Sequence, residues 1–129
     1  GAFSFVAGAL DHSPEAGRGV AQSRSIAADR AYGDWREMLA GEAKRSDRVD
    51  LVTVATPNNT HFEITKAFLE NGFHVLCEKP MTITVEQGEE IVKIALRDAR
   101  NNRKRLKSAL ERQKEKKKKG GEDGGDGRP

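Results

Sequence analysis

The chain has 129 residues, of which 36% are hydrophobic and 33% charged, and its formal net charge is +3. This length allows one domain at most, and the high charged fraction indicates that part of the chain does not pack into a core. The sequence contains no run of about 18 apolar residues, so we expect no membrane span. No positively charged leader precedes an apolar segment, so we expect no secretory signal. The single cysteine, Cys77, has no disulfide partner and no neighbours at metal-ligand spacing. We therefore expect no metal site and a reducing, cytoplasmic location.

The positive charge is concentrated toward the C-terminal end. Residues 1–96 hold 10 Lys and Arg against 14 Asp and Glu, whereas residues 97–119 hold 12 against 3. This break predicts a domain over residues 1–96 and a basic extension over residues 97–129. The extension has a thin apolar stripe at helical spacing, so it is predicted to be either helical or disordered, and its Gly- and Asp-rich end to be disordered.

The first predicted elements are a strand and two helices. Residues 3–10 are apolar nearly throughout, which is typical of a parallel strand buried on both faces, and Asp11 follows at the strand end. A Ser-Pro pair then begins a helix over residues 13–22. Asp34 caps a short second helix whose apolar residues share one face.

The next elements alternate strand, helix, strand and helix. Residues 50–55 are the clearest strand, and residues 61–71 form a helix that Gly72 stops. Residues 74–77 are another strand, and a capping box at residues 84–87 begins a last helix that reaches about residue 96. This alternation predicts an α/β fold, a doubly wound parallel sheet with helices on both faces.

Polar residues follow two of the predicted strands. Thr56-Pro57-Asn58 ends one, and Glu78-Lys79-Pro80 ends the other. In an open α/β sheet, ligands bind at the carboxyl ends of the strands, so both clusters are expected at one crevice. The first cluster also has an ordinary interpretation: Thr56-Pro57-Asn58 is a common strand-to-helix turn with an Asn cap.

Lys79 of the second cluster and two further residues, Asp11 and His61, are individual candidates for that crevice. Lys79 is a possible proton donor or acceptor, or else a solvated loop lysine. Asp11 is placed to bond the ribose hydroxyls of a dinucleotide, or else is a turn aspartate before a helix. His61 is either the first residue of a helix at the crevice or only a neighbour of the cap.

The basic extension is a rival signal. Residues 97–119 carry the triplet Arg103-Lys104-Arg105 and the run Lys116 to Lys119. Such a segment is able to bind phosphate backbones without sequence preference. No aromatic residue lies among the basic ones, so base stacking is not predicted. The alternative is a solvated, frayed helix.

Residues 49–92 resemble the second half of the nucleotide-binding domain of the Gfo/Idh/MocA oxidoreductases. The motifs TPN-x-x-H, at residues 56–61, and EKP, at residues 78–80, carry the resemblance. It extends back to residue 3 and covers residues 3–96. Members of this family are two-domain enzymes that move a hydride between NAD or NADP and a hydroxyl carbon of a sugar, cyclitol or related substrate.

The resemblance implies roles for particular residues. Lys79 matches the catalytic lysine, and Asp11 matches the acid that favours NAD over NADP. Glu78 is expected beside the nicotinamide and the substrate. The cofactor-binding residues that it implies are Asp11, Thr56, Pro57, Asn58, His61, Glu78, Lys79 and Pro80.

The sequence also departs from the family pattern. No Gly-x-Gly-x-x-Gly fingerprint for the pyrophosphate precedes Phe3, and no substrate domain is present. We therefore expect an incomplete Rossmann-like sheet, a fragment of the enzyme with little or no turnover alone. Strands without their usual neighbour expose edges, which favours self-association and marginal stability. The alternative function is a non-enzymatic interaction module whose basic tail binds nucleic acid or an acidic partner.

Overall fold

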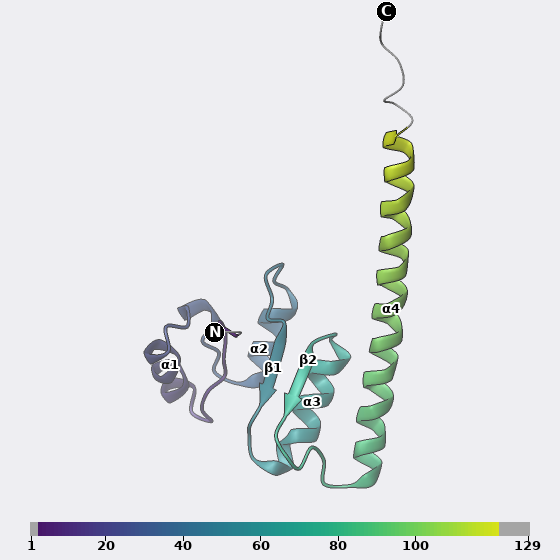
Figure 1. Ribbon diagram of the computed structural model, residues 1–129. Coiled ribbons are helices and arrows are strands. Elements are labelled where there is room, and N and C mark those ends of the chain that lie inside the picture. Colours follow the sequence, from purple (N-terminus) through teal and green to yellow (C-terminus); the bar gives the residue numbers. More distant parts are fainter. Residues whose placement is uncertain (1–2, 122–129) are drawn as a thin grey trace, which may run out of the picture. The chain divides into compact units, whose positions relative to one another are not determined.

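The structure, a computed structural model, describes residues 3–121, with side chains up to Lys119 (Figure 1). Contacts divide the chain into two compact units, the first ending at Ile94 and the second beginning at Ala95. The elements in chain order are α1 (Pro14–Ser23), the 3-10 helix η1 (Ala28–Arg30), α2 (Trp35–Ala43), β1 (Leu51–Val54), the 3-10 helix η2 (Asn58–Thr60), α3 (His61–Glu70), β2 (His74–Cys77) and α4 (Val85–Gly121).

The two strands form a parallel pair, as the sequence predicted. Leu51 lies opposite His74 and Val54 opposite Cys77, with α3 as the crossover between the strands. β2 has the predicted bounds, and β1 lies within the predicted range. The strand-helix-strand alternation thus gives a short parallel sheet in a Rossmann-like α/β fold.

The strand predicted over residues 3–10 is wrong. Within it, only Gly8 makes a bridge, to Ala31: Gly8 N–H donates to Arg30 C=O at 3.0 Å, and Tyr32 N–H donates to Gly8 C=O at 2.8 Å. Phe3 is 82% exposed. A strand buried on both faces needs a paired neighbour and elements that cover those faces, and in the described part of the chain the pairing of this segment is limited to the Gly8–Ala31 bridge. Apolar composition alone was therefore not sufficient to form the strand.

The predicted starts of the first two helices are confirmed. Ser13 is the N-cap of α1, and its Oγ accepts from Ala16 N–H at 3.4 Å. Asp34 is the N-cap of α2, where Oδ1 accepts from the N–H groups of Arg36 and Glu37 at 2.7 and 2.9 Å. These bonds satisfy donors that a helix start otherwise leaves unpaired.

The boundaries of α3 are also near the predicted ones. Thr60 stands at its N-cap but makes no side-chain cap bond, because η2 leads directly into the helix. Gly72 follows the C-terminal end with φ +77°, a left-handed conformation that glycine adopts without a side-chain clash.

The last helix, α4, is much longer than predicted. Thr84 Oγ1 accepts from Gln87 N–H at 3.2 Å, which is half of a capping box; Gln87 Oε1 accepts from Ile83 N–H instead of completing it. Of the two alternatives for the extension, the structure has the helix through residue 121. The predicted disordered terminus, from residue 122 on, lies outside the described residues. None of the described helices is long and apolar enough to cross a membrane.

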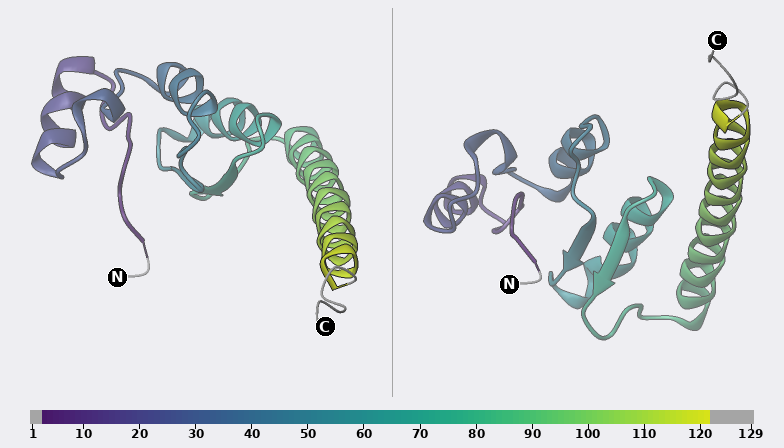
Figure 2. Two further views of the ribbon diagram at one scale, coloured as in Figure 1. Left: turned by 90° about the horizontal axis from the view of Figure 1, so that it is seen from above. Right: turned by 45° about the horizontal axis from the view of Figure 1, so that its top comes forward.

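The core of the first unit lies between the sheet and its helices. Side chains of β1 alternate, so that Val52 and Val54 are buried while Leu51 is exposed. Figure 2 shows α2 and α3 on the same side of the two strands. The buried cluster comprises Met38, Val49, Val52, Val54, Ile64, Phe68 and Phe73.

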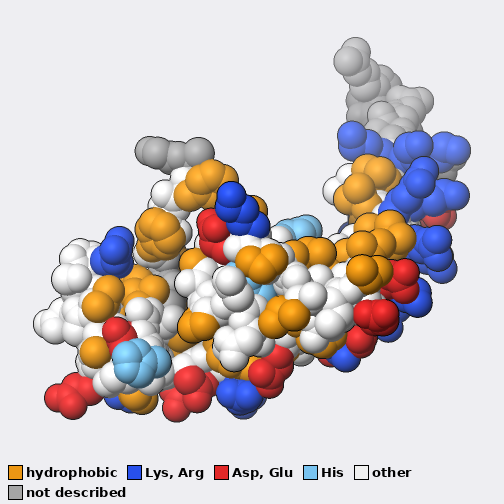
Figure 3. Space-filling model, turned by 90° about the horizontal axis from the view of Figure 1, so that it is seen from below, with side chains coloured by type: hydrophobic (Ala, Val, Ile, Leu, Met, Phe, Trp, Pro, Cys, Tyr) orange, Lys and Arg blue, Asp and Glu red, His pale blue; other side chains and the backbone are white. Residues whose placement is uncertain are grey.

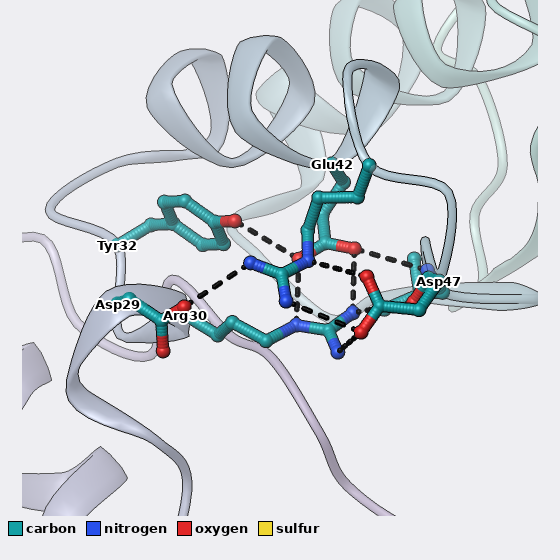
Figure 4. Close-up of polar contacts among 7 residues, drawn as sticks. Asp29, Arg30, Tyr32, Glu42 and Asp47 are labelled. Carbon is teal, nitrogen blue, oxygen red and sulfur yellow. Dashed lines mark hydrogen bonds and ion pairs between the residues drawn. The ribbon is translucent and has the colours of Figure 1, made fainter.

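A buried ion pair joins η1 to α2. Figure 4 shows the Arg30 guanidinium and the Tyr32 hydroxyl pointing to the Glu42 carboxylate, which is fully buried. Arg30 Nε and Nη2 donate to the two oxygens of Glu42 at 3.0 and 2.7 Å. Tyr32 Oη and Val49 N–H donate to the same carboxylate at 2.9 and 3.0 Å. The carboxylate therefore fixes the loop before β1 to the two preceding helices.

Candidate functional site

Two turns meet at one edge of the sheet. Because β1 and β2 are parallel, their carboxyl ends lie at the same edge, which is the lower one in Figure 1. Glu78 N–H donates to Val54 C=O at 2.9 Å, so pairing continues one residue beyond β2. The first turn, residues 56–58, and the second turn, residues 78–80, therefore begin side by side, as the sequence predicted.

The first turn is fixed by its own hydrogen bonds. Thr60 Oγ1 lies 2.6 Å from both Thr56 Oγ1 and the Pro57 carbonyl oxygen, and Thr60 N–H donates to that carbonyl at 2.9 Å. A hydroxyl carries one proton, so the Thr60 hydroxyl donates to the Pro57 carbonyl oxygen and accepts from the Thr56 hydroxyl. Thr56, Pro57 and Asn58 remain exposed at this edge.

The second turn carries the candidate lysine. Glu78, Lys79 and Pro80 are all exposed. The Lys79–Pro80 peptide bond is cis. Lys79 thus stands at the sheet edge where ligands bind in α/β folds, and its assignment as the catalytic residue stays a prediction.

His61 differs from the other candidates because it is buried. Its exposed fraction is 1%, and its Nε2 and Nδ1 atoms each lie 2.7 Å from a backbone oxygen, those of Thr56 and Pro80 respectively. The ring therefore contacts both turns. In the sequence, the one sign of this link is a histidine at the start of a helix with a buried face.

Asp11 makes local contacts. Its Oδ1 accepts from Ser13 N–H at 2.9 Å and lies 3.1 Å from His12 Nδ1. Neither contact joins Asp11 to the two turns, so its assignment to the adenosine ribose stays a prediction. Among the residues that the structure describes, no group of three or more His, Cys, Asp and Glu side chains is arranged to hold a metal ion.

Comparison with known proteins identifies the family of this chain. The sequence model of an oxidoreductase family with an NAD-binding Rossmann fold, Gfo/Idh/MocA, matches residues 2–105. The uncharacterized oxidoreductase YfiI of Bacillus subtilis is 46% identical over 94 residues, which are 73% of this chain and 24% of YfiI. The scyllo-inositol 2-dehydrogenase (NADP(+)) IolW of the same organism is 43% identical over 54 residues, 42% of this chain and 15% of IolW.

A solved structure agrees. The crystal structure of an inositol dehydrogenase homolog from Azotobacter vinelandii, in complex with NADH and myo-inositol, superimposes with a TM-score of 0.74 and 45% sequence identity. The match covers 75% of this chain and 26% of that protein. The chain thus spans about a quarter of the length of YfiI and of the inositol dehydrogenase homolog. By fold and sequence, it belongs to the Gfo/Idh/MocA family of oxidoreductases with an NAD-binding Rossmann fold.

Proposed function

We propose that this chain supplies the nicotinamide end of a dinucleotide site and the proton-transferring lysine of a sugar or cyclitol dehydrogenase. The single observation that carries the proposal is the meeting of the two turns at one sheet edge, where Glu78 N–H bonds to Val54 C=O. Exposed hydroxyl and amide side chains in the first turn fit the uncharged nicotinamide ribose, and Lys79 stands in the second turn. The substrate class follows from the named activities of the relatives.

The chemistry assigned to Lys79 is a proton transfer. When bound, a nicotinamide cofactor supplies the hydride acceptor. The Lys79 amine takes the proton from a substrate hydroxyl, while the hydride leaves the carbon that bears this hydroxyl. The substrate thereby becomes a carbonyl compound and the lysine an ammonium ion. We further propose NAD as the cofactor, because the Asp11 carboxylate repels the additional phosphate of NADP.

We expect little or no turnover from these 129 residues alone. The sequence contains no Gly-x-Gly-x-x-Gly turn to hold the pyrophosphate. The described turns also present Lys79 without a histidine or aspartate side chain hydrogen-bonded to it. The testable property of this chain is therefore cofactor binding at the two turns.

A nuclear magnetic resonance titration tests the proposal. We expect NAD⁺ and nicotinamide mononucleotide to shift the amide signals of residues 56, 58–60 and 78–79, because both carry the nicotinamide riboside. Adenosine monophosphate, which lacks it, is expected to leave those signals in place. The proposal fails if NAD⁺ at saturating concentration leaves both turns unchanged, or if adenosine monophosphate shifts them equally.

A second candidate function rests on α4. Residues 97–119 contain twelve Lys and Arg but only three Asp and Glu, and all of them belong to one continuous helix. Figure 3 shows Lys and Arg gathered along this helix. Such a density of positive charge attracts polyanions, so we propose a sequence-independent contact with nucleic-acid phosphates.

Salt dependence tests this second function. We expect binding to a labelled DNA duplex to weaken steeply with salt, and the triple variant Arg103→Gln, Lys104→Gln, Arg105→Gln to lower the slope of log K against log salt by about 1 per lost phosphate contact. The double variant Arg18→Gln, Arg24→Gln removes charge outside α4 and is the control. The proposal is excluded if DNA binding is independent of salt, or if the triple variant and the double control variant bind DNA with the same affinity and salt dependence.

A further inference from the structure

His61 makes contacts that reach from one strand end to the other. Its ring belongs to the first residue of α3 and is 1% exposed. Nε2 lies 2.7 Å from the carbonyl oxygen of Thr56, in the first turn, and Nδ1 lies 2.7 Å from that of Pro80, in the second. Among the side chains that the structure describes, this is the one whose hydrogen bonds join the two turns.

The chemistry of these two contacts makes them specific to the turns. Both partners of the ring are backbone carbonyl oxygens, which only accept hydrogen bonds, so the ring bonds a turn through an N–H donor. In a ring that is 1% exposed, no water is at hand to replace the carbonyl oxygen as the partner of that N–H. The ring is therefore held between the two turns.

The same contacts exclude a direct role in ligand binding. Both ring nitrogens are occupied by carbonyl oxygens inside the fold, so the ring is unable to bond a cofactor without releasing one of the turns. Any effect of His61 on the site must therefore act through the positions of the two turns.

We propose that His61 is a positioning residue that holds the first and second turns at a fixed separation through the contacts of its two ring nitrogens with their backbone carbonyl oxygens. The bonded carbonyls belong to Thr56 and to Pro80, which directly follows Lys79 in the chain. The separation that the ring sets is thus the one between the nicotinamide-binding groups and the proton-transferring amine. This consequence for the site rests on the proposed function, whereas the link itself does not.

The unaltered chain provides the first test, because no variant has to fold. Long-range proton–nitrogen spectra of His61 are expected to show a ring N–H that is protected from exchange with water. A ring whose N–H exchanges as fast as those of the exposed histidines overturns the proposal. His12 and His74, which are both exposed, serve as internal references.

Variants provide the second test, by hydrogen exchange. In His61→Phe, exchange of the Thr60 and Glu78 amides is expected to accelerate together by at least about tenfold, which corresponds to about 1.4 kcal/mol, beyond any change in global stability. In His61→Gln, whose side-chain amide donates to a single turn, only one of these amides is expected to accelerate. Phe68→Leu is the matched control, because it perturbs a buried residue of the same helix away from the turns.

The outcomes separate this proposal from the cofactor proposal. If Thr60 and Glu78 accelerate no more in His61→Phe than in Phe68→Leu at equal loss of stability, His61 is only a core residue and the proposal is wrong. If they accelerate together but NAD⁺ binds neither protein, the link stands and the cofactor role fails. If both proposals hold, His61→Phe weakens NAD⁺ binding more than Phe68→Leu does.

Discussion

Replacing Glu42 with alanine is expected to destabilise the first compact unit by about 3–5 kcal/mol, the usual cost of removing one partner of a buried ion pair. The Glu42 carboxylate is fully buried and accepts four hydrogen bonds, two of them from Arg30, which is itself 8% exposed. Its removal leaves the Arg30 guanidinium with only its contacts to Asp47, at 3.2 Å to the carbonyl oxygen and 3.6 Å to the exposed carboxylate. It also leaves the Tyr32 hydroxyl and the Val49 N–H without their acceptor. Urea denaturation of Glu42→Ala against the unaltered chain measures the loss.

Two controls make this result specific. Glu63 pairs with Arg36 at 2.8 Å, but both side chains are exposed, at 60% and 63%. Glu63→Ala is therefore expected to cost less than about 1 kcal/mol. The double variant Arg30→Met, Glu42→Ala is expected to cost less than the two single variants added together, because the charge left unpaired by each is then absent. A loss below about 1 kcal/mol for Glu42→Ala contradicts the expectation.

The same cluster gives stability a defined pH dependence. Burial by itself raises the pKa of Glu42, but the hydrogen bonds from Arg30, Val49 N–H and Tyr32 outweigh it and hold the pKa below its ordinary value of 4.5. The stabilisation is therefore present above pH 4.5 and is lost as the pH falls through the lowered pKa of the folded state.

Tyr32 reports on the cluster at the alkaline end. Burial, reinforced by the bond to Glu42, raises the pKa of Tyr32 from 10.0 to about 12. Its contribution is complete below pH 10 and is lost as the pH rises through about 12. Tyr32 is the only tyrosine of the chain, so its absorbance titration reads this group alone. In Glu42→Ala, the midpoint is expected to move back toward 10.

The sequence was sufficient where structure depends on local rules. Ser13 and Asp34 cap helices because their short oxygen-bearing side chains reach the N–H groups two or three residues ahead. Gly72 ends α3 because it adopts a positive φ without strain. The two turns were predicted to meet because parallel strands end at the same edge, which requires no knowledge of the rest of the sheet.

The structural features that the sequence did not predict depend on contacts between residues far apart in the chain. The segment over residues 3–10 has the composition of a buried strand, but a strand forms only where a neighbour pairs with it. Arg30 and Glu42 are 12 positions apart and look like surface residues until η1 and α2 are packed together. The contact of His61 with Pro80 spans 19 positions and depends on how both turns fold.

The largest effect on activity is expected at Lys79. Because this chain spans about a quarter of the Azotobacter vinelandii homolog, the test uses a hybrid in which this chain replaces the matching segment of that protein. Lys79→Met in the hybrid is expected to lower kcat for myo-inositol oxidation by about 10²–10⁴-fold, the usual contribution of a general acid-base group. The KM for NAD⁺ is expected to change little, since methionine keeps the shape of the lysine stem. Formation of NADH, followed by absorbance, measures both constants.

A second substitution separates proton transfer from positive charge. Lys79→Arg keeps the charge, but the guanidinium does not release its proton at accessible pH, so the loss in kcat is expected to match that of Lys79→Met. Lys93→Met, an exposed lysine of α4 in the first unit, is the control and is expected to keep full activity. Activity retained in Lys79→Arg but lost in Lys79→Met assigns an electrostatic role to Lys79 instead of proton transfer. Activity retained in both variants removes Lys79 from the catalytic machinery altogether.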